Sequence, residues 1–224
     1  MAAWKAKPWI LKAIASIEKQ RVRPGWEYEL RIGVDGCEET SSALLEVGIG
    51  HYWSEENVGP YLIRNSLIEL EAADAYAPFD SDDIMKAPYL DELLSWIGSR
   101  GIAGAGRTQV SNKGRILRRR ARFQGGVCVM SAGAWAKVGG YRPWRMAADH
   151  DLILRARRLG VPVKAVREPL YFRRKHPGSL TNHPVTGLGS PARDELWKHM
   201  NQLTAKGKDL CIRPRTVELE RRDP

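Results

Sequence analysis

Three carboxylates stand within four residues at the end of an apolar run, and their spacing suits metal chemistry. Residues 72–79 are mostly apolar and end abruptly in Asp80, Asp82 and Asp83. A turn after a strand can bring these side chains around one hard divalent cation, and Mg²⁺ or Mn²⁺ with a phosphate ligand is the natural occupant. The alternative is that Asp80 caps the next helix, whose first turn favours its acidic neighbours.

Positive charge is the second feature with chemical consequences. The chain of 224 residues has a formal net charge of +10, which raises the local concentration of anionic partners. Two runs hold much of it. Residues 113–122 contain six cations and no acid, and residues 167–175 contain four cations. Each run is either a solvated face or a contact surface for a polyanion.

Length and composition predict one domain with a sizeable core. The three cysteines are widely spaced and odd in number, which fits neither a disulfide framework nor a zinc site. No apolar run approaches the roughly 20 residues that span a bilayer, and residues 1–7 are not followed by the apolar segment of a secretory signal. We therefore expect a cytoplasmic protein without a transmembrane segment.

Hydrophobic periodicity predicts alternating helices and strands. The expected helices are 8–20, 38–47, 59–71, 86–97, 132–138, 149–160 and 194–203. The expected strands are 28–34, 72–79, one from about 98–106 onward, 126–131, 161–166 and 170–173. The strand at 28–34 delivers Asp35 to a loop, residues 113–122 are expected as a loop, and Asp149 is placed to cap its helix. Such alternation is typical of an α/β sandwich with a central, mostly parallel sheet.

Six short motifs occur in an order that resembles the family 2-type glycosyltransferases of the GT-A fold, over most of residues 8–181. No single motif is specific, but six in the correct order are hard to obtain by chance. The motifs are residues 8–17 as the first helix, Asp35-Gly36 as the nucleotide-binding turn, Asn57 and Gly59 with Arg64 and Asn65, residues 79–83 as the aspartate-x-aspartate motif, Gly139-Gly140-Tyr141, and residues 148–152 with Arg155.

The resemblance implies a GT-A-like three-layer α/β sandwich with a central mostly parallel sheet. It places the glycosyltransferase domain at residues 1–190, with residues 191–224 as a C-terminal helix and tail that pack on the same domain.

The resemblance also implies roles for single residues. Asp82 and His176 would bind the metal, which is Mn²⁺ or Mg²⁺; imidazole suits Mn²⁺ better. Asp35, Arg64 and Asp80 would bind the donor, and Asp149 would be the catalytic base. The residues expected at the acceptor are Trp144, Arg118, Arg119 and Arg120. The alternatives are a solvated helix residue for Arg64 and a solvated loop residue for His176.

Two departures from the family pattern stand out. The first strand of the family is missing, so residues 210–212, residues 216–219 or a neighbouring molecule would complete the sheet; the last option makes a homo-oligomer. The second departure is Ala148, which stands where relatives usually have Glu before the base.

Together these features predict a metal-dependent, inverting glycosyltransferase that uses a nucleotide-diphosphate sugar, with uridine as the expected base. The basic runs favour a polyanionic acceptor such as a hydroxylated base in DNA, flipped into the site. A lipid-linked or surface glycan at an anionic membrane would use the same charge. The alternative outside enzymes is a nucleic-acid-binding module on a degenerate transferase scaffold.

Overall fold

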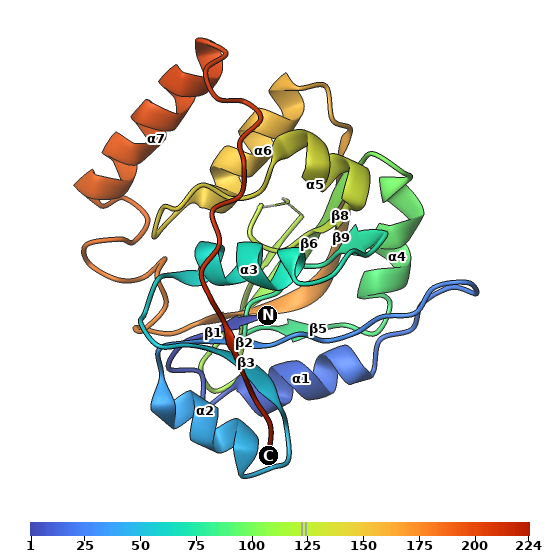
Figure 1. Cartoon of the computed structure of the whole chain (residues 1–224), viewed down its shortest axis with the longest axis vertical. Helices are drawn as coiled ribbons and strands as arrows, with labels where there is room; N and C mark the ends of the chain where they lie inside the picture. Colours follow the sequence, from blue (N-terminus) through green and yellow to red (C-terminus); the bar gives the residue numbers. More distant parts are fainter. Residues whose placement is uncertain (122, 124) are drawn as a thin grey trace.

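The computed structural model describes residues 1–121, 123 and 125–224 (Figure 1). Arg122, which belongs to the first basic run, lies outside the described residues. The helices are α1 (Ile10–Glu18), α2 (Glu38–Leu45), α3 (Pro60–Glu69), α4 (Tyr89–Ile97), α5 (Ala132–Val138), α6 (Ala148–Arg158) and α7 (Pro191–Ala205). The strands are β1 (Ala2–Ala3), β2 (Gly33–Asp35), β3 (His51–Ser54), β4 (Ala75–Tyr76), β5 (Ile84–Met85), β6 (Ile102–Ser111), β7 (Ile116–Arg120), β8 (Val129–Ser131), β9 (Val163–Lys175) and β10 (Glu220–Arg222).

Two sheets meet at the centre of the molecule. The first has the order β1-β2-β3-β10, and the second has the order β4-β8-β6-β9-β5 with β7 paired to β6. The ladders β1/β2, β2/β3 and β6/β9 are parallel, and the others are antiparallel. An isolated parallel bridge between Ala2 and Asp80 links the two sheets. The predicted α/β sandwich is confirmed, with parallel ladders at its centre.

The helices form where apolar residues recur at helical spacing. On α1 the side chains of Ile10, Ala13, Ile14 and Ile17 are buried against the largest core cluster, as the period of 3.6 residues requires of one helix face. A second cluster lies beneath α5 and α6. None of the described helices combines the length and apolarity needed to cross a bilayer.

The strands differ from the prediction mainly in extent. The expected strand at 28–34 contracts to β2, and the two expected strands at 161–166 and 170–173 are one strand, β9, whose ladder with β6 shifts register beside Gly106. The expected loop at 113–122 is wrong, because residues 116–120 form β7 in a hairpin with β6. All side chains of β7 are exposed, so it lacks the apolar alternation that identifies a half-buried strand.

The expectation that the first strand is absent also needs correction. Ala2 and Ala3 form a short strand parallel to β2 at the expected sheet position. The C-terminal tail instead covers the opposite edge, where β10 pairs with β3. The segments proposed to fill the position lie elsewhere: the Ile212 amide bonds the Val138 carbonyl at 3.3 Å, and the Val217 amide bonds the Ser66 hydroxyl at 2.8 Å.

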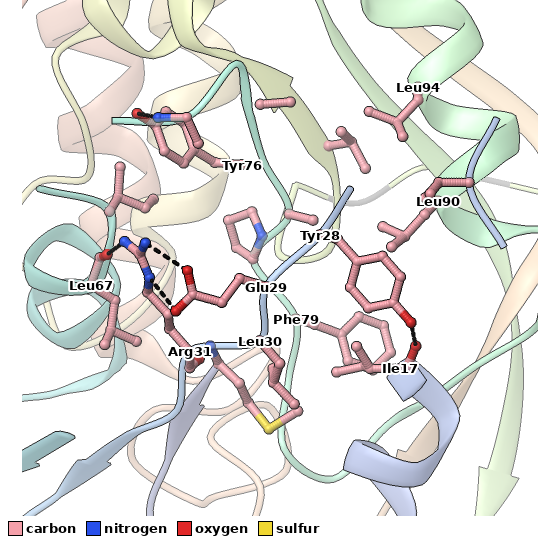
Figure 2. A pocket seen from close by; sticks show the side chains of 18 of the residues that line it. Ile17, Tyr28, Glu29, Leu30, Arg31, Leu67, Tyr76, Phe79, Leu90 and Leu94 are labelled. Carbon is pink, nitrogen blue, oxygen red and sulfur yellow. Dashed lines mark hydrogen bonds and ion pairs between the residues drawn. The ribbon is translucent and has the colours of Figure 1, made fainter. Parts of the chain in front are cut away.

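An apolar cavity of about 230 Å³ lies beyond Met1 (Figure 2). Its walls are residues 26–31, residue 73, residues 75–79 and side chains of α3 and α4. Met1, which also lines it, directly precedes β1, and β1 pairs with β2 on one side and bridges to Asp80 on the other. Figure 2 shows Tyr28 reaching across to the Ile17 carbonyl, which accepts its hydroxyl bond at 3.0 Å.

A buried ion pair fixes α6 to the end of α5. Asp151 and Arg155 are both fully buried, and Arg155 Nε lies 2.7 Å from Asp151 Oδ2. The Arg155 guanidinium also donates to the Val138 carbonyl at 2.7 Å and to the Gly140 carbonyl at 2.6 Å. Every member of this network has a partner, as buried charges require. The network sets the position of the first turn of α6.

Replacing the buried guanidinium should therefore destabilise the whole fold. Arg155→Met leaves the Asp151 carboxylate with the weaker Arg142 contact at 3.3 Å and removes the guanidinium bonds to the Val138 and Gly140 carbonyls. We expect a loss of about 3–5 kcal/mol in the free energy of unfolding, measured by urea denaturation. Arg158→Met, on the exposed face of the same helix, should change stability by less than about 0.5 kcal/mol. Equal stability of the two variants would contradict the role of the pair.

Candidate functional site

The three acidic side chains of the loop between β4 and β5 come together in space. Asp80, Asp82 and Asp83 each offer an oxygen, and these oxygens lie within 4.8 Å of one another. The alternative that Asp80 caps the next helix is wrong, because α4 starts after Pro88 and has no side-chain cap.

Asp83 is the most buried of the three carboxylates, at 2% exposed. Its Oδ1 accepts a 2.8 Å bond from the Arg174 amide, while its Oδ2 is buried and has no partner among the described residues. Burial raises the pKa of Asp83 well above its usual value, and the charges of Asp82 and Asp80 raise it further. A buried carboxylate oxygen of this kind costs free energy unless a cation or a donor satisfies it.

Asp80 is anchored to the helix that faces it. Its Oδ1 pairs with the Arg64 guanidinium of α3, which is only 5% exposed, so the solvated-residue alternative for Arg64 is wrong. Burial raises the pKa of Asp80, the Arg64 charge opposes that rise, and the charges of Asp82 and Asp149 add to it.

The two predicted metal ligands are in direct contact. His176 follows β9, and its Nε2 lies 2.8 Å from Asp82 Oδ2. The imidazole stacks on the Trp9 indole with ring centres 4.1 Å apart, and its side chain is 9% exposed. The interpretation of His176 as a solvated loop residue is therefore wrong. Oxygen ligands with one imidazole form a donor set that suits Mn²⁺ or Mg²⁺.

Asp149 lies in the first turn of α6 and faces the same region. Its Oδ1 accepts a 2.7 Å bond from the Tyr61 hydroxyl. The helix cap is Ala147, in a left-handed conformation with φ 58°, so the expectation that Asp149 caps the helix is wrong. A Cβ on Gly126 would stand 3.1 Å from Asp149 Oδ2, which shows how closely the backbone before β8 approaches this carboxylate.

Helix α3 joins the two halves of the site. Tyr61 and Arg64 are three residues apart and therefore share one helix face. Tyr61 holds Asp149, and Arg64 holds Asp80. Burial raises the pKa of the Tyr61 phenol, and the Asp149 charge raises it further, so Tyr61 stays a hydrogen-bond donor. Tyr61 lies outside the sequence motifs; its helical spacing from Arg64 was the available signal.

The Asp35 carboxylate is hydrogen-bonded to the residues that precede α3. It is 2% exposed, and its carboxylate accepts bonds from the Val58 amide at 2.7 Å and the Gly59 amide at 3.0 Å. The Asn57 side chain donates a third bond at 3.0 Å. Burial raises the pKa of Asp35, and the two amide bonds oppose the rise. In this arrangement Asp35 shapes the turn before α3.

The predicted acceptor residues fall in two places. Trp144 lies in the loop before α6, with its ring 6.3 Å from that of His199 on α7. Arg118, Arg119 and Arg120 lie on the exposed strand β7. The structure thus brings Arg64, Asp80, Asp82, Asp149 and His176 around one region and leaves the roles of Trp144 and the arginines as predictions. Sequence reasoning gave no role at the site to Trp9, whose indole stacks on His176.

Comparison with known proteins finds similar structures but no similar sequence. No protein-family model and no curated protein matches the sequence. Among solved structures, the mannosyltransferase PcManGT from Pyrobaculum calidifontis, in complex with GDP-Man and Mn²⁺, is similar with a TM-score of 0.63 and 12% identity. That match covers 91% of this chain and 68% of PcManGT.

S. aureus TarS, residues 1–349, is similar with a TM-score of 0.62 and 15% identity, over 77% of this chain and 58% of TarS. The chain therefore spans little more than half of that neighbour. The fold that these comparisons define is the GT-A-like glycosyltransferase fold, as the motif order predicted.

From the crowded charges of the acidic cluster, we predict that removing one carboxylate raises stability and weakens metal binding. Asp83→Asn removes one of three crowded charges, so in EDTA it should raise the melting temperature by roughly 2–4 °C, the shift that about 1 kcal/mol produces in a chain of this size. Mn²⁺ should stabilise the wild type more than this variant. Asp74→Asn, an exposed acid just before β4, is the control and should change neither value. A wild type that gains nothing from Mn²⁺ would refute the metal site.

The raised pKa of Asp83 gives the same cluster a pH dependence. A carboxyl with a folded pKa above its unfolded value binds more protons in the folded state, so metal-free stability should rise as pH falls through the raised pKa toward the unfolded value. Asp83→Asn should lose this gain. Melting curves in EDTA from pH 8 to about pH 5 test the sign, and a wild-type stability that falls over this range as steeply as that of the variant would contradict it.

Proposed function

We propose that this protein is a metal-dependent, inverting glycosyltransferase that moves a sugar from a nucleotide-diphosphate donor to a hydroxyl acceptor. The observation that carries the proposal is the pairing of His176 with Asp82 inside a three-carboxylate cluster, on the fold of known glycosyltransferases. The PcManGT neighbour in complex with GDP-Man and Mn²⁺ supports the same classes of donor and metal.

Asp82 and His176 would hold the cation, with Asp80 and Asp83 completing the carboxylate set. The unpartnered Oδ2 of Asp83 supports this fit. When bound, the divalent cation neutralises negative charge that develops on the departing diphosphate. Arg64 would keep Asp80 ionised and oriented, because its buried guanidinium pairs with that carboxylate. The sequence resemblance favours uridine as the base of the nucleotide, and we retain it as the proposed donor.

Asp149 is the proposed general base. The acceptor hydroxyl gives its proton to Asp149 as its oxygen bonds to the anomeric carbon, and the bond from that carbon to the diphosphate breaks, releasing a nucleoside diphosphate. Attack opposite the leaving group inverts the anomeric carbon. Tyr61 orients Asp149 through its 2.7 Å bond to Oδ1, which leaves Oδ2 for the acceptor proton.

The acceptor is proposed only as a hydroxyl compound. Trp144 and the arginines of β7 are the proposed contacts, on the strength of sequence position and charge. A hydroxylated base in DNA stays a prediction that rests on the basic runs of the sequence. The charge serves a glycan at an anionic surface equally well. Donor binding without any hydrolysis or transfer would instead favour the binding-module alternative.

Removing the proposed base should separate chemistry from binding. Asp149→Asn keeps the size and the Tyr61 contact of the side chain but cannot accept the proton, so transfer or donor hydrolysis should fall by about 10²-fold or more. Calorimetry should show unchanged binding of nucleoside diphosphate with Mn²⁺.

The matched variant is Tyr61→Phe, which keeps the carboxylate and removes only its orienting bond. Its activity should fall by less than that of Asp149→Asn. Turnover of Asp149→Asn close to wild type would exclude Asp149 as the base. Loss of Mn²⁺-dependent donor binding in Asp82→Ala, with the fold intact by circular dichroism, tests the metal half of the site separately.

A further inference from the structure

The hairpin of β6 and β7 presents an unusual surface. Its turn, residues 112–115, is closed by a bond from the Ser111 amide to the Arg115 carbonyl at 2.9 Å, and Gly114 supplies the left-handed residue with φ +84°. The strand that returns from this turn is exposed along its whole length. The described residues therefore leave β7 uncovered and available to a partner.

Cations flank two large apolar side chains on this hairpin. Lys113, Arg115 and residues 118–120 contribute five positive charges without an acid between them. Between them Ile116 is 55% exposed and Leu117 is 43% exposed. The arginines alone have a simple explanation, since charges on an edge strand prevent unwanted pairing. Two adjacent exposed aliphatic residues work against that protection, so they require a different explanation.

The hairpin is tied to the candidate site through β9. At the turn end of the hairpin, Ser111 pairs with Lys175, the last residue of β9, and His176 of the proposed metal site follows directly. Arg174 donates to the Asn112 carbonyl at 2.9 Å and to the Asp82 carbonyl at 3.0 Å. One guanidinium therefore bridges the hairpin turn and the acidic loop, so a surface bound by the hairpin turn lies beside that loop.

We propose that this hairpin docks the protein on an anionic phospholipid surface, with Ile116 and Leu117 entering the headgroup region and the surrounding cations contacting lipid phosphates. Positive charge beside a few apolar side chains is the combination that interfacial binding uses. Duplex DNA would use the cations, but its phosphate backbone offers nothing to the exposed aliphatic pair. If the hairpin docks in this way, the sugar acceptor is presented at the same surface, and this consequence rests on the proposed function. The docking of the hairpin does not depend on the proposed function.

Vesicle co-sedimentation at low salt tests the proposal on the full chain. The wild type should bind vesicles of equal parts phosphatidylcholine and phosphatidylglycerol, bind pure phosphatidylcholine vesicles weakly, and lose affinity as salt rises. Ile116→Ser with Leu117→Ser should weaken binding by about tenfold or more while all five cations remain. The matched control is Val185→Ser with Leu188→Ser, an apolar pair that is even more exposed (62% and 58%) on another loop, which should leave binding unchanged.

Three outcomes would overturn the proposal. The first is no vesicle binding at low salt, and the second is equal vesicle binding by both double variants. The third is tighter binding to duplex DNA than to anionic vesicles, with the Ile116/Leu117 variant binding DNA as the wild type does; that result would assign the hairpin to nucleic acid. Donor hydrolysis without vesicles should be unaffected by this double variant, so failure of docking and failure of the proposed transferase activity give different results.

Discussion

The buried pairing of Arg64 with Asp80 is the interaction on which the site depends. A guanidinium that is 5% exposed needs a counter-charge, and the loop with three crowded carboxylates supplies it through Asp80. The pair therefore holds the acidic loop against α3. Because Tyr61 sits one turn away on the same helix face and binds Asp149, one helix sets the separation between the proposed metal ligands and the proposed base.

Two further sets of contacts hold this arrangement in place, one at α6 and one at the acidic loop. The Asp151–Arg155 pair locks α6 to the carbonyls that follow α5, which fixes the turn that carries Asp149. On the opposite side, Arg174 joins the acidic loop to the hairpin turn. The candidate site is therefore assembled from segments far apart in the chain, each held by a charged side chain with specific partners rather than by apolar packing alone.

The crowding of negative charge has a functional meaning. Three carboxylates within 4.8 Å repel one another, and Asp83 keeps a buried oxygen without a partner among the described residues. The divalent cation of the proposed site would neutralise this charge and give that oxygen a partner. A site that lowers the stability of the ligand-free protein and restores it on ligand binding is a common compromise between stability and function.

The sequence by itself determined the fold class, the helices and the acidic cluster, because periodicity and motif order are local properties of the chain. Only the tertiary structure decided that Asp35 is used by its own turn, that Ala2 and Ala3 complete the sheet, and that β7 is a strand. These outcomes depend on pairing between distant segments, and β7 has no buried face to mark it in the sequence. The partnership of Tyr61 with Asp149 joins residues 88 positions apart, and only folding brings them together.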